Sequence, residues 1–371
     1  MDENFFWNHL PRPIVGLAPM DGVTDAVFRA ITARHGGPDI SFTEFTPVDR
    51  IVLGHDPELS DLRYSEIERP VIAQVFGTEP DSFYRVAHLI CELGFDGIDI
   101  NMGCPSKTIA GAGAGAGLIR TPDRAREILR RTRQGIRDWA AGQTIDRIGL
   151  PASVPEDIRR AKARWFGHGV EAIMETPRQT IPVSVKTRLG YDQVVIEDWI
   201  HSLLSESPAA ITLHGRTLAQ RYRGEADWEA IARAAEIVRG SRTLILGNGD
   251  IRSAATAVRR IRETGVHGVL IGRAAMGNPW IFTACDSIRT AVQTGEAPMA
   301  PSVSPAEKLA VALEHAELFD RTRGELSFRV VRKFLSAYCR GFENASELRQ
   351  RLVRVDTLRE LEAILQPVVC A

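Results

Sequence analysis

A lone cysteine stands just past a short apolar run, in a polar, glycine-containing turn. The run Gly97–Ile100 leads into Asn101, and Cys104 follows within the segment Asn101-Met102-Gly103-Cys104-Pro105. A buried strand that ends in such a turn would carry both side chains to the rim of a sheet or barrel. A thiol at the end of a strand beside a flexible loop is typical of a reacting group. The alternative, a small cysteine buried in the core, is also common.

A glycine-alanine repeat follows this cysteine. Residues 111–117 alternate between the two smallest side chains, which predicts a flexible loop able to open and close over the thiol. The repeat is not a nucleotide-binding P-loop, because no Gly-Lys-Ser/Thr follows it.

The other apolar runs also end in polar residues or glycine turns. In chain order these endings are Pro19 with Met20, Glu44, Gln74, Lys186 with Arg188, His214 with Arg216, Asn248-Gly249-Asp250, and Gly272 with Arg273. Strands that alternate with helices in a barrel place such endings on one face. We therefore expect a single active site at that face.

Two of these endings suit a phosphate group. The turns Gly247–Asp250 and Gly272-Arg273 offer backbone N–H groups, a helix start and one guanidinium. Phosphate-bearing ligands bind at the corresponding place in many barrels. Either turn alone could be an ordinary glycine turn, but two on adjacent strands favour a phosphate site.

Lys186 and His214 end neighbouring strands and are expected to point inward as cations. In that position they could stabilise the negative charge of a reduced flavin. Gln74 provides both a donor and an acceptor, which match the amide edge of a flavin ring. The alternative is a structural network in which the basic residues pair with Glu44 or Asp99.

Eight strand–helix repeats must position these groups. Strands are predicted at 14–18, 40–44, 71–76, 97–101, 182–187, 210–214, 243–247 and 268–271. Amphipathic helices are predicted between them at 25–34, 81–93, 123–133, 227–238 and 253–264, with Thr24, Thr121 and Ser253 as candidate caps. Eight such units predict a (β/α)8 TIM barrel of class α/β, with a doubly wound open sheet as the alternative.

Two regions depart from this repeat. Residues 134–180 are predicted to form an inserted helical segment within a barrel domain of residues 1–300. After a proline-rich linker, residues 301–371 predict a small all-α bundle. One stretch of the bundle is rich in basic residues and contains only two acids, Glu343 and Glu347. These basic residues form either an ordinary solvated face or an RNA-docking face. They are Arg329, Arg332, Lys333, Arg340, Arg349, Arg351 and Arg354.

Composition excludes several classes of protein. The net charge of −1 over 371 residues excludes a global basic field, so RNA binding would need local patches. The five cysteines form no Cys-x-x-Cys pair, which argues against a zinc site or a disulfide framework and for a reducing cytoplasm. No signal-type segment and no apolar run of about 20 residues is present. We expect a soluble cytoplasmic protein without metal or membrane association.

The motifs together resemble the signatures of tRNA-dihydrouridine synthases. The segments are Leu17–Asp25, Asp99–Pro105, Val185–Gly190, Leu213–Thr217, Gly247–Ile251 and Ile271–Ala274, in family order. The resemblance runs from about residue 14 to residue 365 and is absent over roughly 134–180. It implies an FMN-dependent barrel followed by a helical tRNA-binding domain, an enzyme that reduces uridine to 5,6-dihydrouridine with NADPH or NADH as the reductant.

The resemblance also implies residue roles. Cys104 would be the general acid that protonates uracil C5 after a hydride reaches C6. Contacts to the flipped uracil would come from Asn101, Arg188 and Arg216. FMN would be held by Pro19, Met20, Asp21, Gln74, Lys186, His214, Asn248, Gly249, Asp250, Gly272 and Arg273.

Two other functions remain as alternatives. One is an FMN-dependent oxidoreductase that acts on a free pyrimidine and is similar to dihydroorotate dehydrogenases. The basic C-terminal bundle disfavours this alternative. The other is an RNA-binding module with a vestigial site. Binding one tRNA requires only one chain, so a monomer is expected.

Overall fold

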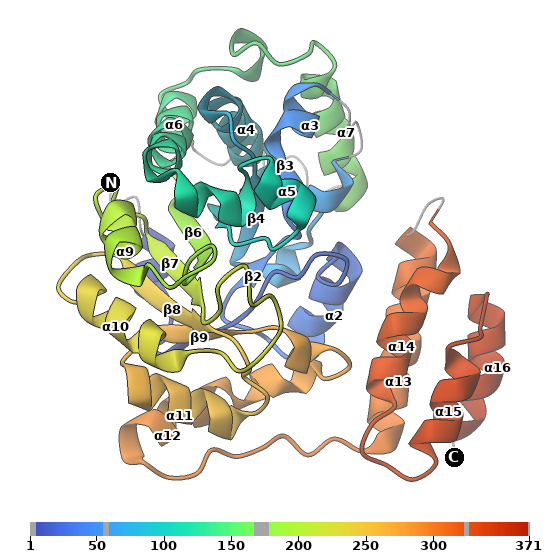
Figure 1. The fold of residues 1–371 in the computed structure, drawn as a ribbon. Helices are drawn as coiled ribbons and strands as arrows, with labels where there is room; N and C mark the ends of the chain where they lie inside the picture. The colour runs from blue at the N-terminus through green and yellow to red at the C-terminus, as the bar shows by residue number, and fades with distance from the viewer. Residues whose placement is uncertain (1–4, 55–58, 167–177, 323–325, 370–371) are drawn as a thin grey trace.

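The chain closes eight parallel strands into a barrel. The computed structural model describes residues 5–54, 59–166, 178–322 and 326–369 (Figure 1). The sheet order is β1-β9-β8-β7-β6-β5-β4-β2, and all pairs are parallel. The strands are β1 (Ile14–Leu17), β2 (Ser41–Phe42), β4 (Val71–Phe76), β5 (Gly97–Met102), β6 (Val183–Arg188), β7 (Ala210–His214), β8 (Leu244–Asn248) and β9 (Gly268–Ile271).

Backbone hydrogen bonds between the ends of this order close the barrel. Leu17 N donates to Ile40 O at 3.0 Å, and Asp39 N donates to Val15 O at 3.1 Å, which joins β1 to the segment entering β2. A short additional strand, β3 (Thr46–Pro47), pairs with the outer part of β4. The predicted TIM barrel is confirmed, and the open doubly wound sheet is excluded.

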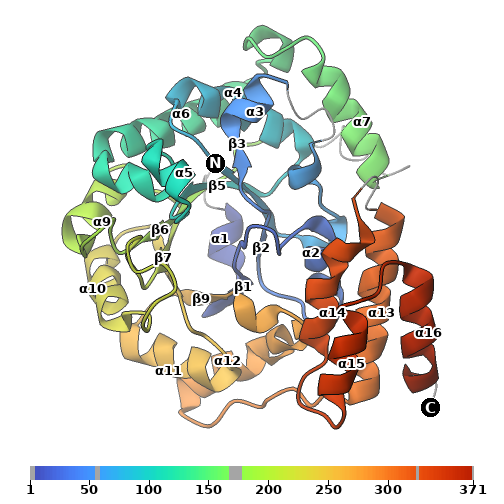
Figure 2. The same cartoon turned by 45° about the vertical axis from the view of Figure 1, so that its right-hand side comes forward.

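Helices surround the barrel (Figure 2). The main ones are α2 (Ala26–His35), α4 (Pro80–Leu93), α6 (Pro122–Ala140), α9 (Ile196–Leu204), α10 (Trp228–Val238), α11 (Ala254–Thr264) and α12 (Cys285–Thr294), with shorter α1 (Phe5–His9), α3 (Val48–Val52) and α5 (Lys107–Gly111). Ser253 caps α11 as predicted, by accepting from Thr256 N at 3.2 Å. Thr121 is the N-cap residue of α6, as predicted, but its side chain makes no cap hydrogen bond. The prediction of Thr24 is wrong, because Asp25 caps α2.

The predicted insertion begins inside a barrel helix. Helix α6 continues to Ala140, and Trp139 Nε1 donates to Glu92 on α4 at 2.9 Å. A Cβ on Gly135 would lie 2.3 Å from Tyr84 O, so glycine lets α6 approach α4 closely. Helix α7 (Val154–Phe166) then lies beside α3 and α4 (Figure 1). Residues 167–177 of the insertion lie outside the described part of the chain.

The carboxyl-terminal residues form the predicted helical bundle. It comprises α13 (Pro305–Thr322), α14 (Arg332–Tyr338), α15 (Ala345–Leu352) and α16 (Leu358–Val369), with a 3₁₀ turn at Phe328–Val331. Phe334 packs against Phe28 of α2, with ring centroids 5.5 Å apart, and stacks on His315 at 4.7 Å. Burial lowers the pKa of His315 to about 3, so a neutral imidazole packs between bundle and barrel.

Candidate active site

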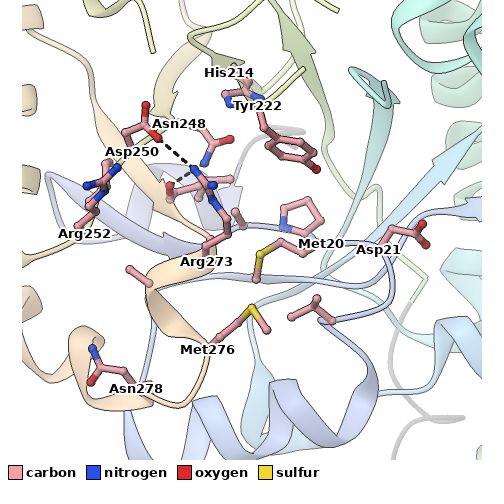
Figure 3. A pocket seen from close by; sticks show the side chains of 18 of the residues that line it. Met20, Asp21, His214, Tyr222, Asn248, Asp250, Arg252, Arg273, Met276 and Asn278 are labelled. Atoms are coloured by element: carbon pink, nitrogen blue, oxygen red, sulfur yellow. Dashed lines mark hydrogen bonds and ion pairs between the residues drawn. The ribbon is translucent and has the colours of Figure 1, made fainter. Parts of the chain in front are cut away.

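A cavity of about 1340 Å³ opens at the carboxyl ends of the barrel strands (Figure 3). It is lined by every residue that the sequence placed in the site except Arg216. Barrel and bundle both contribute, since Lys308, Tyr338 and Arg340 also line it. The structure therefore brings together residues from the strand ends and from the C-terminal helices.

The wall after β1 is a tight turn at Met20. Met20 N donates to Thr24 Oγ1 at 2.9 Å, and that hydroxyl donates back to Met20 O at 3.2 Å. The Sδ atom of Met20 would lie 3.3 Å from a Cβ placed on Gly272, so a glycine there keeps the cavity open between β1 and β9. In Figure 3, the side chains of Met20 and Met276 lie close to each other and beside Arg273.

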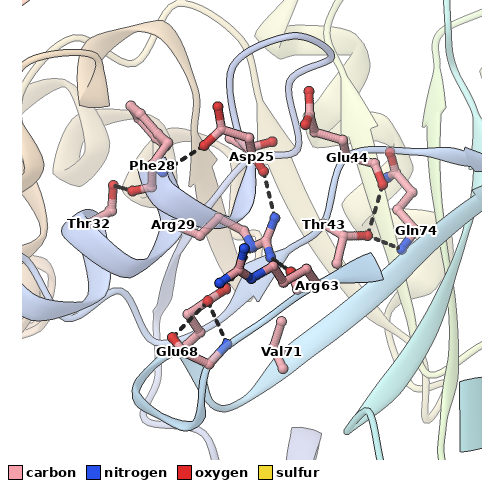
Figure 4. Close-up of polar contacts among 12 residues, drawn as sticks. Asp25, Phe28, Arg29, Thr32, Thr43, Glu44, Arg63, Glu68, Val71 and Gln74 are labelled. Carbon is pink, nitrogen blue, oxygen red and sulfur yellow. Dashed lines mark hydrogen bonds and ion pairs between the residues drawn. The ribbon is translucent and has the colours of Figure 1, made fainter. Parts of the chain in front are cut away.

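A buried ion pair supports this turn from behind (Figure 4). Arg29 Nε lies 2.7 Å from Glu68 Oε2, with the two residues 1% and 3% exposed. Arg29 Nη1 donates to Thr24 O at 2.7 Å, and Glu68 Oε1 accepts from Ser65 N at 2.8 Å. Because each charge is paired and hydrogen-bonded, the pair fixes the Thr24 backbone without leaving a buried charge unpaired.

The turn after β8 approaches its neighbours too closely for a side chain. Gly249 has φ +130°, and a Cβ there would lie 2.7 Å from Ala226 Cβ. Asn248 Nδ2 donates to Leu270 O at 2.9 Å, which ties this turn to β9. Glycine at 249 therefore lets this turn pack against Ala226 and His214, while the residue also lines the cavity.

Asp250 holds two arginines. Its carboxylate lies 2.6 Å from Arg216 Nη2 and 3.0 Å from Arg273 Nη2, and it accepts from Ala226 N at 2.9 Å. The Arg273 side chain is 60% exposed and lines the cavity, so its other N–H groups can face a ligand. Arg252, which the sequence reasoning missed, lines the same region.

Arg216 takes a different place from the predicted uracil contact. It is 2% exposed, and it donates to Gly224 O at 2.6 Å as well as pairing with Asp250. It does not line the cavity. In this structure Arg216 stabilises the turns after β7 and β8, and its contact with uracil stays a prediction.

Lys186 and His214 differ in charge. Burial lowers the pKa of Lys186 to about 8, so the amine stays largely protonated at neutral pH. Burial and the neighbouring cations, Lys186 and Arg188 first among them, lower the pKa of His214 well below its ordinary value. The expectation of two cations is therefore wrong for His214, which presents a neutral imidazole.

Cys104 lies buried at the cavity wall, and it is 7% exposed. Burial raises the pKa of its thiol, so the group is protonated at neutral pH. Arg188 Nε donates to Gly103 O at 2.6 Å, which anchors the turn. A protonated thiol in an anchored turn has the form that proton donation requires.

The second half of the glycine-alanine repeat is packed, whereas Gly111 and Ala112 are exposed. Residues 114–119 are buried, and Ala116 N donates to Cys104 O at 3.4 Å. A Cβ on Gly115 would lie 3.0 Å from Cys104 Cβ, and one on Gly117 would lie 2.6 Å from Ala110 O. The expected opening loop is thus corrected: the small residues let this segment pack directly under the cysteine turn.

The predicted alternative network of charges does not form. Asp99 accepts from Gln74 Nε2 at 2.7 Å and from Ser184 Oγ at 2.6 Å. Across the described residues, no ion pair joins the cations of β6 to Asp99 or Glu44. Gln74 keeps one donor hydrogen and one acceptor lone pair for a ligand.

The sequence reasoning also missed an aromatic residue and the bundle contribution. Tyr222 is 64% exposed at the cavity, and the Arg273 guanidinium lies 5.7 Å from its ring centroid. An aromatic between Arg221 and Arg223 is a signal that the sequence offered. Arg340 belongs to the predicted basic set, but nothing in the sequence placed it or Tyr338 at the cavity, because helix periodicity does not specify how a bundle docks.

Part of the basic face of the bundle is neutralised. Arg329 and Arg332 pair with Asp356 at 2.6 and 2.5 Å, an acid just beyond the stretch compared in the sequence. Lys333 donates to Gly22 O in the turn after β1. Four arginines of the set are exposed without an ion pair in the described part of the chain, namely Arg340, Arg349, Arg351 and Arg354.

Comparison with known proteins agrees with this geometry. The profile of the dihydrouridine synthase (Dus) family matches residues 16–138 and 162–370. A probable tRNA-dihydrouridine synthase 2 from Bacillus subtilis is 32% identical over 98% of this chain and 96% of its own length. A probable tRNA-dihydrouridine synthase from Staphylococcus aureus is 32% identical over 98% of this chain and 95% of its own.

A fold comparison adds a distant similarity. A DHODH from Eimeria tenella in complex with ferulenol matches 62% of this chain and 60% of its own with a TM-score of 0.41 and 13% identity. None of the described helices is long and apolar enough to cross a membrane. The near-complete profile match and the relatives of equal length identify this chain as a member of the dihydrouridine synthase family.

Proposed function

We propose that this chain reduces uridine in tRNA to 5,6-dihydrouridine, with FMN as the resident cofactor and NADPH or NADH as the reductant. The observation that carries the proposal is a buried, protonated Cys104 thiol in the wall of a large cavity whose other residues suit a flavin. The family membership supports the reaction and the flavin. A free-pyrimidine oxidoreductase explains neither the basic bundle nor the match through residue 370.

The cavity residues fit FMN by shape and charge. The backbone of Gly249, which lines the cavity, and the exposed guanidinium of Arg273 suit its phosphate and ribityl chain. The remaining donor and acceptor of Gln74 suit the polar edge of the ring, and protonated Lys186 suits negative charge there. Reduced FMN supplies the hydride for uracil C6.

The chain's own residues then perform the proton chemistry. Cys104 donates its proton to uracil C5, and the raised pKa of the thiol keeps it protonated until that step. Lys186 and Arg188, both beside the cavity, stabilise the negative charge that develops on the uracil carbonyl side. The turn containing Cys104 stays fixed because Arg188 holds Gly103 O.

Binding of a tRNA substrate would explain the basic surface of the bundle. A uridine in folded tRNA must leave its stack to enter the cavity, at a cost of a few kcal/mol. Exposed arginines such as Arg349 and Arg351 can offset that cost by binding backbone phosphates. Lys308 and Arg340 extend this basic surface to the cavity mouth. One chain suffices for one tRNA, so we propose a monomer acting in the cytoplasm.

A reconstitution assay tests the function. Purified protein should carry flavin absorbance, and with NADPH it should add two hydrogens to a uridine of tRNA taken from a strain that lacks dihydrouridine. Mapping the modified position by mass spectrometry identifies the target. Turnover of orotate without RNA would instead support the free-pyrimidine alternative, and tRNA binding without any reduction would support a vestigial site.

A further inference from the structure

Four side chains beside the cavity form a continuous chain of hydrogen bonds across three strands. Asp99 on β5 lies in register between Gln74 on β4 and Ser184 on β6. Ser184 Oγ donates to Asp99 Oδ1 at 2.6 Å, and Gln74 Nε2 donates to Asp99 Oδ2 at 2.7 Å. Asn101 Nδ2 then donates to Gln74 Oε1 at 3.0 Å.

The far end of this chain is the turn with the cysteine. Asn101 Oδ1 accepts from Gly103 N at 3.0 Å and from Cys104 N at 2.9 Å. Gln74 and Asp99 are fully buried, and Asn101 is 7% exposed. Water therefore cannot readily replace a missing partner, and a broken link would leave buried polar atoms unsatisfied.

The groups at both ends of this series of hydrogen bonds require compatible orientations of the Gln74 and Asn101 amides. A carboxylate only accepts hydrogen bonds, so Asp99 requires the NH₂ group of Gln74 to face it. Backbone N–H groups only donate, so Gly103 and Cys104 require the oxygen of Asn101. These two demands leave Gln74 Oε1 facing Asn101 Nδ2, which is the pairing observed.

We propose that Asp99 is a positioning residue, which fixes the orientation of both amides and, through Asn101, the turn that carries Cys104. Both lone pairs of Asn101 Oδ1 are used, so this side chain offers a ligand only its second N–H. At Asn101 the cavity therefore selects a hydrogen-bond acceptor on the substrate. That last point rests on the proposed function, whereas the positioning of the turn does not.

Reversing the donor and acceptor roles along this series of hydrogen bonds tests the proposal. In Asn101→Asp the new carboxylate oxygen faces Gln74 Oε1, and turning the Gln74 amide would bring its oxygen against Asp99. The added change Asp99→Asn removes this conflict, because an amide at position 99 donates to Gln74 Oε1 and accepts from Ser184. The double variant keeps one carboxylate, as in the parent chain, with the donor and acceptor roles along the chain reversed.

The readout is the rate at which iodoacetamide alkylates Cys104 in the flavin-loaded protein, corrected with Cys104→Ala. Asn101→Asp should raise this rate roughly tenfold, the equivalent of one hydrogen bond removed, and lower the unfolding temperature. Asp99→Asn/Asn101→Asp should return the rate to within about threefold of the parent, by the same conversion. Asp99→Asn alone should change little, since Ser184 Oγ can accept as well as donate.

A variant with the same net charge separates the effect of hydrogen-bond direction from that of repulsion between the carboxylates at positions 99 and 101. Asp99→Leu/Asn101→Asp also keeps one carboxylate but gives Gln74 Oε1 no donor, so its alkylation rate should stay high. Equal rescue by leucine and asparagine would overturn the proposal, as would a parental rate in Asn101→Asp. If Asn101→Asp does not fold, recovery of a folded protein by Asp99→Asn but not by Asp99→Leu supports it. Alkylation does not depend on tRNA reduction, so failure of the proposed function leaves this result separate.

Discussion

At the scale of single residues, protonation states define the site. Burial keeps Cys104 as a thiol and His214 as a neutral imidazole, while Lys186 retains a proton at neutral pH. The cavity wall thus contains a thiol with a transferable proton, and Lys186 and Arg188 are among the cations that line it. This division suits a reaction in which charge develops on a carbonyl and a proton is delivered to carbon.

Cys104→Ala should lower the rate of dihydrouridine formation by roughly 10²- to 10⁴-fold, the usual contribution of a general acid. Flavin content should be unchanged, because the flavin contacts proposed above do not involve the thiol. Single-turnover reduction of tRNA by the pre-reduced protein measures the step directly. Parental rates in the alanine variant would remove Cys104 from the mechanism.

Glu44 provides a pH test outside the cavity lining. Burial, followed by the neighbouring Asp25, raises the pKa of Glu44 from 4.5 to about 7 (Figure 4). The folded state therefore binds this proton more tightly than the unfolded state. The stability from this group is fully present below about pH 4.5 and is lost as the pH rises through about 7.

Glu44→Gln should remove this part of the pH dependence, and the gain in unfolding temperature over the parent should grow from pH 5 to pH 8. Thermal unfolding across that range, with the exposed Glu296→Gln as the control, measures it. An unchanged pH profile in Glu44→Gln would show that Glu44 titrates normally.

At the scale of elements, the sequence predicted the strands well because each is a continuous apolar run. β1, β4, β7 and β9 match their predicted ranges within one residue, whereas only Ser41–Phe42 of the predicted 40–44 strand pairs. Helix ends were less predictable. Nothing in the periodicity showed that α6 continues to Ala140, and composition alone suggested a mobile loop at 111–117, where close packing actually explains the glycines.

For the candidate site, too, some features could be predicted from the sequence and others could not. The site residues expected from the motifs line the cavity with one exception, because motif position determines which strand end carries each one. Arg216 is that exception, since its pairing with Asp250 depends on the conformations of two turns. Tertiary docking likewise determines the contribution of Tyr338 and Arg340.

Gly249→Ala tests the turn after β8. The added Cβ meets Ala226 and must adopt a φ of +130°, so we expect a loss of about 1–3 kcal/mol in unfolding free energy and weaker flavin retention. Gly240→Ala is the matched control, because its φ is +83° but nothing lies within 4 Å of the new Cβ. Denaturant unfolding and flavin release measure both effects; equal behaviour of the two variants would contradict a packing role for Gly249.

At the scale of the whole molecule, the bundle is joined to the barrel next to the cavity. Phe334 packs on Phe28 of α2, Glu314 pairs with His35 at 2.6 Å, and Lys333 donates to Gly22 O. The bundle therefore lies adjacent to the Met20 wall. We expect the remaining exposed arginines to define the tRNA side of the molecule.

Arg349→Ala should weaken tRNA binding and reduce the slope of log K against log salt concentration by about 0.7–0.9 for each phosphate that the guanidinium neutralises. Arg329→Ala should have a smaller effect, because Asp356 already neutralises Arg329 at 2.6 Å. Binding titrations at several salt concentrations compare the two. A larger change for Arg329 than for Arg349 would contradict this assignment of the RNA-binding arginines.

The shared lining of the cavity also constrains protein engineering. A Cβ on Gly277 would lie 2.3 Å from the Ala337 backbone, so the β9 loop and α14 meet with no space for adaptation. A chimera that exchanges the bundle for that of another family member thus replaces part of the cavity wall together with the RNA surface. Attempts to transplant target choice by domain exchange should alter flavin retention unless the 274–278 loop is exchanged with the bundle.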